Sequence, residues 1–369
     1  MSVDAAREIL RGLTDPEQLA RHEHWAPGTV YGGDAGVALA FGRLHRIEPD
    51  GGWDRIAHWF ITRAARQLTP DRLGLLDGLS GTAFVLRFLG EGGRRYVGAT
   101  ASAESLLMVR TRQLLDALPP APRTCRQYDA LSGLTGVGAA LLTVPSGRSL
   151  LADVLDRLAR WTASGFHAAL DEPGDTVNLG LAHGIPGPLA LFALARRAGQ
   201  DCEEWVAHDL AKQLLANLVP AEHGPDLPAW VPNTSAEPTR LAWCYGNIGA
   251  ARALQLAGDA FGVPEWTASA LTMTRSALAR LDEPSARLRE PIVCHGTAGV
   301  LQVLSRICAD AGGPLDLLAE RSGLLRRLLA EPVPDSPGLL TGAAGVALAL
   351  LSAAGPIDDT DWDRTLLIG

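Results

Sequence analysis

Two short stretches of the sequence place metal-binding side chains at the head of apolar runs. Cys294 and His295 are adjacent in PIVCHGTAGVL, and Cys244 lies fifty residues earlier in WCYGNIGAARAL. Thiolate and imidazole groups are typical zinc ligands, and soft thiolates disfavour magnesium and calcium. The three residues form one metal site only if the two stretches occupy equivalent positions in the fold.

A repeated G-x-x-G motif indicates that the positions are equivalent. Each copy opens an apolar run that carries few or no charges. The seven copies begin at Gly33, Gly78, Gly133, Gly184, Gly246, Gly296 and Gly342. A recurring spacing of roughly 50 residues is the signature of a repeat architecture. Cys244 and Cys294 each lie two residues before the first glycine of their copy, so adjacent repeats are expected to bring them together.

Amphipathic stretches separate the glycine-headed runs. In residues 52–68, 149–166 and 203–218 the apolar residues recur at three- and four-residue spacing. This spacing predicts helices with one exposed face, whereas the glycine-headed runs predict buried helices. Seven such helix-pair units, buried helices inside and amphipathic helices outside, predict an all-α fold, an α/α toroid or double α-barrel. An open solenoid is the alternative, but it would leave apolar end faces uncovered.

The chain, residues 1–369, is expected to form a single toroid domain. Within it, residues 1–28 are predicted to be an N-terminal helical cap and residues 353–369 a C-terminal tail. The Pro-rich segment 220–240 is poor in helix-forming residues and is expected to be a loop that covers the substrate. The uncharged stretch 338–357 has the length of a membrane span, but its similarity to the other repeats predicts a buried helix instead.

Composition narrows the possible functions of the protein. Hydrophobic residues make up 47% of the chain and aromatic residues only 5%, so Leu, Ala and Val must build the core. The net charge is −8 without a basic cluster, which argues against nucleic acid as a partner because phosphate binding requires a basic face. Five cysteines and a charged N-terminus without an apolar signal segment predict a cytoplasmic protein with reduced thiols and no integral membrane segment.

The residues that precede the glycines are expected to line a shared pocket, because seven helix N-termini converge at one end of the ring. Cys244, Cys294 and His295 then form a zinc site with three protein ligands and one open coordination position, as catalytic zinc sites have. His183, directly before the fourth motif, is a candidate acid or base near neutral pH. Asp129 either orients His183 or caps a helix.

Other arginine, cysteine and histidine residues do not share the position of Cys244 and Cys294 relative to a glycine motif. Arg240 lies four residues before Cys244 and is expected to reach the pocket rim. The remaining cysteines are expected to be ordinary packing thiols: Cys125, Cys202 and Cys308. Three histidines are expected on the solvated surface: His167, His208 and His223.

The motifs taken together resemble the LanC family of lanthipeptide cyclases. The stretches WCYG, CHG, HGIPGPL and D-x-L-S-G-L-x-G occur in that register over seven G-x-x-G units, and the resemblance covers roughly residues 29–352. Members of this family are α/α toroids that hold one zinc ion. The zinc ligands that the resemblance implies are Cys244, Cys294 and His295. The residues of the catalytic site that it implies are His183, Asp129, Arg240 and Tyr245.

The resemblance also implies the reaction. A cysteine of a dehydrated precursor peptide would take the open zinc position as a thiolate. It would add to a dehydroalanine or dehydrobutyrine of the same peptide and form a lanthionine or methyllanthionine thioether ring. His183 would protonate the α-carbon or accept the thiol proton. A dehydratase of the same pathway is a second candidate partner, and the short inter-repeat segments leave little room for the extra peptide-binding subdomain of some family members.

Three further functions remain open on the sequence alone. One is the addition of a free thiol such as glutathione to dehydrated residues in proteins, which would use the same zinc chemistry. Another is a non-catalytic zinc toroid that binds peptides, which would need a fourth ligand and no role for His183. A carbohydrate-active toroid is disfavoured, since such sites rely on paired carboxylates and many aromatic residues, and the chain has seven Phe and four Tyr.

Overall fold

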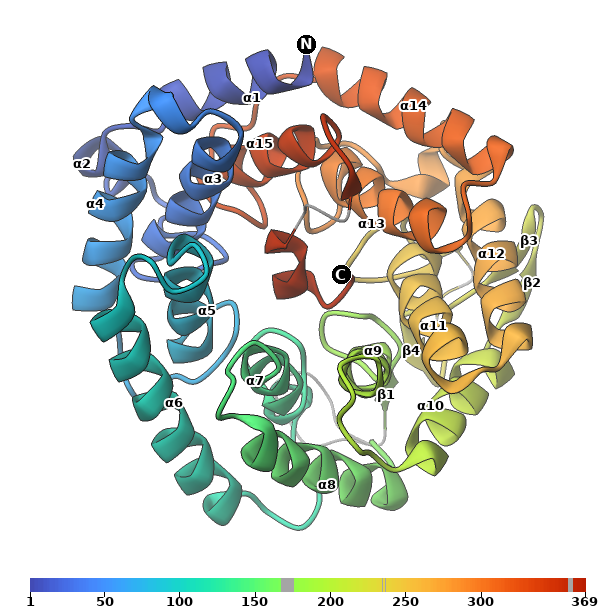
Figure 1. The fold of residues 1–369 in the computed structure, drawn as a ribbon. Helices are drawn as coiled ribbons and strands as arrows, with labels where there is room; N and C mark the ends of the chain where they lie inside the picture. Colours follow the sequence, from blue (N-terminus) through green and yellow to red (C-terminus); the bar gives the residue numbers. More distant parts are fainter. Residues whose placement is uncertain (167–175, 234, 236, 358–360) are drawn as a thin grey trace.

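The described helices of the computed structural model form two concentric rings (Figure 1). The structure describes residues 1–166, 176–233, 235, 237–357 and 361–369, so His167 lies outside the described part. The inner ring contains the helices that follow the glycine motifs. These are α3 (Asp34–Ile47), α5 (Leu79–Leu89), α7 (Leu134–Leu141), α9 (Pro186–Arg197), α11 (Asn247–Phe261), α13 (Thr297–Asp310) and α15 (Ala343–Ser352). The predicted all-α toroid is thereby confirmed.

The outer ring contains the amphipathic helices, each packed against an inner partner. They are α4 (Trp53–Arg66), α6 (Val97–Ala117), α8 (Arg148–Ser164), α10 (Glu204–Ala216), α12 (Pro264–Leu278), α14 (Leu315–Ala330) and α1 (Ser2–Arg11). Helix α1 packs against α15, so the seventh inner–outer pair combines helices from opposite ends of the chain. The remaining helical turns are short: α2 (Pro16–Leu19), η1 (Pro49–Gly51), η2 (Cys125–Gln127) and η3 (Pro284–Ala286).

The inner helices are buried on all sides because Ala, Leu and Val dominate them. In α15 each residue from Ala343 to Ser352 is buried, as expected for the uncharged stretch 338–357. No helix in the described part of the chain combines the length and apolar character needed to cross a bilayer. The hydrophobic core therefore lies between the two rings and around the inner helices, where burial of apolar surface stabilises the toroid.

In six of the seven motifs the second glycine allows the preceding loop to fold closely over the first helical turn, and at Gly187 the approach is looser, at 3.0 Å. A Cβ atom at Gly299 would lie 1.8 Å from the carbonyl oxygen of Val293, and one at Gly345 would lie 1.9 Å from that of Leu339. Separations below 3 Å are not compatible with a side chain. The loops that precede the inner helices are therefore fixed in the same tight geometry, and they present equivalent residues at one end of the ring.

A closed series of backbone hydrogen bonds links these loops. In six of the seven links, the N–H of the residue two positions before a motif donates to the next loop, with N···O distances of 2.8–3.3 Å. The linked residues are Tyr31, Leu76, Leu131, Ala182, Cys244, Cys294 and Leu340, and Leu340 donates back to Tyr31. The seventh link shifts by one residue, because Ala130 rather than Leu131 donates to Ala182. The loops thus form one continuous hydrogen-bonded ring.

The C-terminal segment lies in the centre of the toroid (Figure 1). It forms the 3₁₀-helix η5 (Trp362–Leu366), in which the carboxylate of Asp363 is fully buried and accepts bonds of 2.8 Å from Arg306. The indole N–H of Trp243 donates to the carbonyl of Leu366 at 2.9 Å. Because Trp243 directly precedes Cys244, the central segment supports the loop that carries Cys244.

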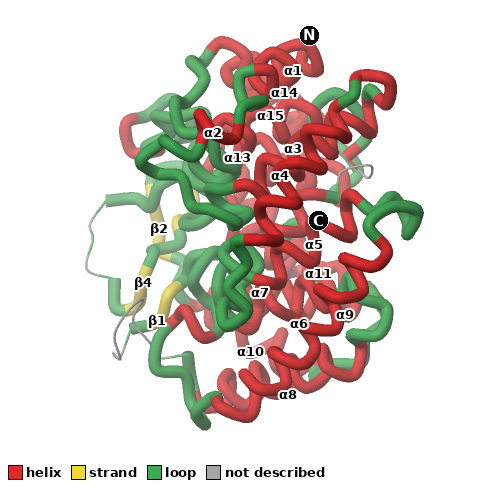
Figure 2. Tube along the Cα trace, turned by 90° about the vertical axis from the view of Figure 1, so that its left-hand side faces the viewer, coloured by secondary structure: helices red, strands yellow, loops and turns green. Residues whose placement is uncertain are grey.

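The segment between α10 and α11 contains most of the β-structure in the described chain. Strand β2 (Val219–Ala221) pairs antiparallel with β3 (Gly224–Asp226), and β4 (Trp230–Val231) pairs antiparallel with the distant β1 (Val177–Asn178). Figure 2 shows these strands on one side of the ring, among connecting loops. The described residues of the Pro-rich segment 220–240 therefore lie on the side of the ring that carries the strands, where the inner helices begin.

Candidate functional site

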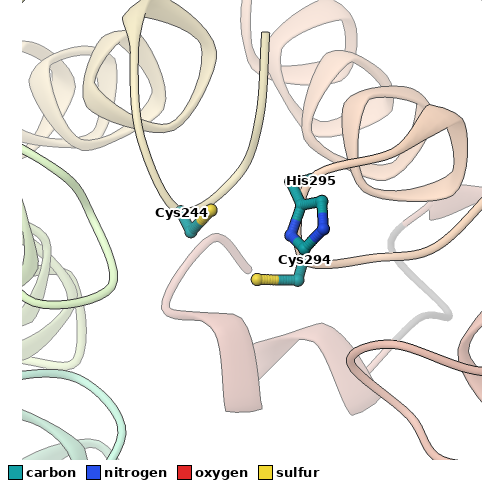
Figure 3. A group of neighbouring side chains, drawn as sticks. All are labelled: Cys244, Cys294 and His295. Atoms are coloured by element: carbon teal, nitrogen blue, oxygen red, sulfur yellow. The ribbon is translucent and has the colours of Figure 1, made fainter. Parts of the chain in front are cut away.

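Three side chains from neighbouring repeats lie together as a candidate metal site (Figure 3). The two sulfur atoms of Cys244 and Cys294 and a ring nitrogen of His295 lie within 4.8 Å of one another. Zn–S bonds of about 2.3 Å in tetrahedral geometry place two sulfurs roughly 3.8 Å apart, so the cluster has the dimensions of a zinc site. The cluster follows from the ring of loops, since the backbone N–H of Cys244 donates to the carbonyl of Cys294 at 3.2 Å.

The electrostatic environment favours an ionised thiol at this cluster. A hydrogen bond from the Cys294 thiol lowers the pKa of Cys244, and nearby His295 and Arg240 act in the same direction. The pKa of Cys294 is raised by its bond to Cys244 and by burial. The carboxylate of Glu290 lies 3.6 Å from Nε2 of His295. The cluster therefore carries the charge and the donor atoms that a divalent cation requires.

The cluster opens into a cavity of about 650 Å³. His183, Arg240 and Tyr245 line this cavity together with Cys244, Cys294 and His295. The segment between α10 and α11 forms another wall, through Val219, Pro220, Pro228, Trp230 and Pro238 among others. The structure thus brings all but one of the residues expected at the site to a single cavity, and the exception, Asp129, lies directly behind His183.

Asp129 divides its two carboxylate oxygens between the backbone and His183. Oδ1 accepts from the N–H groups of residues 131, 132 and 133 at 2.7–3.1 Å, and Oδ2 lies 2.6 Å from Nδ1 of His183. An ionised carboxylate only accepts, so Nδ1 of His183 carries the proton and Nε2 is left for the cavity. Of the two alternatives for Asp129, the contact with His183 is present, whereas the N-cap residue of α7 is Gly133, and the backbone contacts of Asp129 are to the loop before that helix.

Two polar residues behind the site were missed by the sequence analysis. Asp77 and Ser132 occupy the position directly before a glycine motif, as His183, Tyr245 and His295 do. The hydroxyl of Ser132 donates to Asp77 at 2.8 Å. Burial raises the pKa of Asp77, and the negative charge of Asp129 acts in the same direction. Comparing this position across the seven motifs would have identified both residues.

Tyr245 and Arg240 enter the cavity from the loop that carries Cys244. The amide of Asn178 donates to the phenol oxygen of Tyr245 at 2.9 Å, and burial raises the pKa of Tyr245 to about 12. Asn178 was also missed, although it lies six residues before its glycine motif, as Arg240 does. The carbonyl oxygen of each residue lies 2.2 Å from the point where a Cβ atom would stand on the first glycine of the following motif. The two positions are therefore structurally equivalent.

Buried polar contacts anchor the cavity wall to the toroid. The carboxylate of Asp226 accepts from the guanidinium of Arg280 at 3.0 Å and from the N–H of Thr239 at 2.8 Å. Asn247, the first residue of α11, accepts from the N–H of Leu227 and donates to the carbonyl of Pro225. The segment that lines the cavity is therefore fixed at several points along its length.

The residues expected to have no role in the site lie away from it. Cys125 and Cys308 are buried, and Cys202 is partly buried beside the carbonyl of Phe192. His208 and His223 are exposed, and His223 contacts the carboxylate of Glu283 at 2.6 Å. None of these five residues lines the cavity.

Comparison with known proteins gives the class of this fold and site. The sequence profile of the Lanthionine synthetase C-like protein family matches residues 24–367, and the chain belongs to that family. Among solved structures the chain is similar to nisin cyclase, with a TM-score of 0.80 at 17% sequence identity. The match covers 98% of this chain and 96% of nisin cyclase. No curated protein matches this sequence.

Proposed function

We propose that the chain is a zinc-dependent cyclase that joins a peptide cysteine to a dehydroalanine or dehydrobutyrine of the same peptide. The observation that carries the proposal is the single cavity shared by the Cys244, Cys294 and His295 cluster and by His183, which Asp129 orients. Membership of the Lanthionine synthetase C-like family supports the proposal, and so does the fold shared with nisin cyclase.

The cluster fits zinc by donor type and by the spacing of its atoms. It contains three residues in the described part of the chain, which leaves one coordination position of a tetrahedral ion for a substrate. Zinc held by Cys244, Cys294 and His295 would lower the pKa of a bound substrate thiol, so that the thiol binds as a thiolate. Two cysteine thiolates and a neutral imidazole balance the charge of the ion, which preserves the nucleophilicity of the incoming sulfur.

The other cavity residues act on the proton and on the developing charge. When sulfur bonds to the β-carbon, the electron pair of the carbon–carbon double bond moves toward the carbonyl and an enolate forms. Nε2 of His183 is free for the cavity. This imidazole accepts the proton that leaves the thiol and donates a proton to the α-carbon. Arg240 and Tyr245 line the same cavity and provide donors for the enolate oxygen.

The partners follow from the chemistry of the substrate. The proposed substrate is a dehydrated precursor peptide, because the reaction needs an unsaturated residue and a thiol in one chain. A dehydratase must therefore act earlier in the same cytoplasmic pathway. The cavity of about 650 Å³ lies within the usual range for a small-molecule site, roughly 300–1,000 Å³, and it can enclose the two reacting side chains of such a peptide.

The function is tested with a synthetic peptide that carries one dehydroalanine and one cysteine. Cyclisation leaves the mass unchanged and removes the free thiol, so alkylation followed by mass spectrometry measures the product. We expect enzyme-dependent loss of the thiol, and no reaction with a peptide whose cysteine is replaced by serine. In a parallel assay with glutathione, a mass increase of one glutathione without ring formation would favour the free-thiol addition. Loss of neither thiol would contradict both enzymatic functions.

A further inference from the structure

Asn178 makes two hydrogen bonds that fix the orientation of its amide. Its side chain is fully buried. Oδ1 accepts from the backbone N–H of Gly180 at 2.9 Å, and Nδ2 donates to the phenol oxygen of Tyr245 at 2.9 Å. A backbone N–H only donates, so the amide oxygen must face Gly180 and the amide nitrogen must face Tyr245. The phenol oxygen of Tyr245 therefore acts as an acceptor in this contact.

This contact determines where the phenol proton of Tyr245 points. A hydroxyl that accepts a bond from Asn178 has its own O–H left for another acceptor. Tyr245 lines the cavity with His183 and Arg240, so its O–H is the group of this residue that remains to donate to a substrate there. A tyrosine phenol is both a donor and an acceptor, so Tyr245 can accept from Asn178 and still donate its own proton.

Neighbouring residues fix the position of the Tyr245 ring. A Cβ atom at Gly180 would lie 2.5 Å from Cδ1 of Tyr245, so the ring packs directly on the backbone of a glycine. The ring of Trp230 lies 6.4 Å from that of Tyr245, centroid to centroid. Asn178 itself is held by β-pairing with Trp230. The phenol therefore has one position and one hydrogen-bonding orientation.

We propose that Asn178 is a positioning residue that fixes Tyr245 as a hydrogen-bond donor to the carbonyl oxygen of the dehydrated residue under attack. The inference rests on the proposed function, since the acceptor is the oxygen on which enolate charge develops. Fixed donors aimed at developing charge stabilise a transition state because they need no reorganisation during the reaction. Asn178 contributes through Tyr245, and its amide is occupied by the two contacts described above.

The replacement Asn178→Asp tests the orientation directly. The carboxylate retains an oxygen for the N–H of Gly180, but its second oxygen accepts the phenol proton and turns it away from the cavity. We expect kcat for cyclisation to fall by about 10²-fold with little change in KM, as for loss of one such donor. The replacement Tyr245→Phe is expected to lower kcat by a similar factor. The double variant should be no slower than Tyr245→Phe alone, since both changes remove the same donor.

Controls separate this role from a structural one. Asn217→Asp makes the same chemical change at the C-terminal end of α10, outside the cavity, and should leave kcat unchanged. Zinc content and thermal unfolding should match wild type in Asn178→Asp. If that variant does not fold, Asn178→Ser replaces the amide by a shorter hydroxyl and removes the bond to Tyr245 without adding a carboxylate, and a smaller loss of kcat is expected.

Two results would overturn the inference while the wild type still forms rings. One is an unchanged kcat in a folded Asn178 variant. The other is a double variant in which the two losses multiply, because that would mean independent roles. A wild type that forms no ring would instead contradict the proposed function, so the two failures are distinguishable.

Discussion

The Oδ2 atom of Asp129 lies 2.6 Å from Nδ1 of His183, while Oδ1 of the same carboxylate accepts three backbone N–H bonds. The carboxylate is fully buried and cannot rotate without losing these bonds. A buried, saturated carboxylate of this kind fixes both the tautomer and the ring orientation of its histidine. A loop of the neighbouring repeat therefore determines which ring nitrogen of His183 carries the proton and which is left for the cavity.

We expect Asp129→Asn to lower the cyclisation rate by about 10²-fold with little loss of stability. The asparagine retains an oxygen for the three backbone donors, but its amide donates to Nδ1 and so reverses the tautomer of His183. Steady-state kinetics and thermal unfolding measure the two effects separately. An unchanged rate would show that the orientation of His183 is irrelevant to the reaction.

Metal content should depend on the cluster and not on His183. We expect one zinc per chain by mass spectrometry in the wild type, loss of zinc in Cys244→Ala, and full zinc in His183→Ala. Cys308→Ala is the matched control, because this thiol is buried but lies outside the cavity. Zinc lost from His183→Ala as well would make this histidine a fourth ligand. The open position needed by the substrate thiol would then not exist.

The stability of the protein should depend on pH through Asp77. The pKa of Asp77 is raised in the folded protein, so the protonated side chain contributes to the free energy of unfolding. This contribution is complete below the pKa that Asp77 has in the unfolded chain, and it is lost as the pH rises through the pKa of the folded state. Asp77→Asn has no charge to bury, so it should be more stable than wild type at neutral pH and lose this advantage in acid. Denaturant unfolding across the acid range measures the difference, and a pH-independent difference would contradict the assignment.

The close packing at the second motif glycine predicts a large effect from a small substitution. Gly299→Ala should destabilise the protein by roughly 3 kcal/mol, because the new Cβ would meet the carbonyl of Val293 at 1.8 Å. Gly98→Ala is the control, since it lies in exposed helix α6 with no atom within 4 Å of its Cβ position. It should stabilise by about 0.5 kcal/mol. Equal effects of the two substitutions in chemical denaturation would contradict the packing argument.

The repeat pattern was sufficient to predict the architecture and the metal cluster. Cys244 and Cys294 were recognised as equivalent because each lies two residues before a motif. Equivalent positions in adjacent units of a closed ring must be neighbours. His183 is one residue out of register with the cysteines but directly precedes its motif, and its position at the cavity follows from the convergence of the loops.

Contacts between segments outside the repeat pattern could not be predicted in this way. The pairing of β1 with β4 joins two-residue strands about fifty residues apart, and such short strands have no recognisable periodicity. The bond from Trp243 to Leu366 joins a repeat to the C-terminal segment, which has no counterpart in the other units. Asn178 could have been found from its register, but its partner Tyr245 becomes evident only from the positions of the side chains.

The pairing of α1 with α15 determines when the protein can complete its fold. A ribosome produces α1 first and α15 near the end, so the first outer helix has no inner partner for most of synthesis. The bond from Leu340 to Tyr31 must form late for the same reason. An open array of repeats can fold progressively from one end, whereas this toroid closes only after the last inner helix has emerged. The early repeats must therefore remain without this closing contact during translation until α15 has been synthesised.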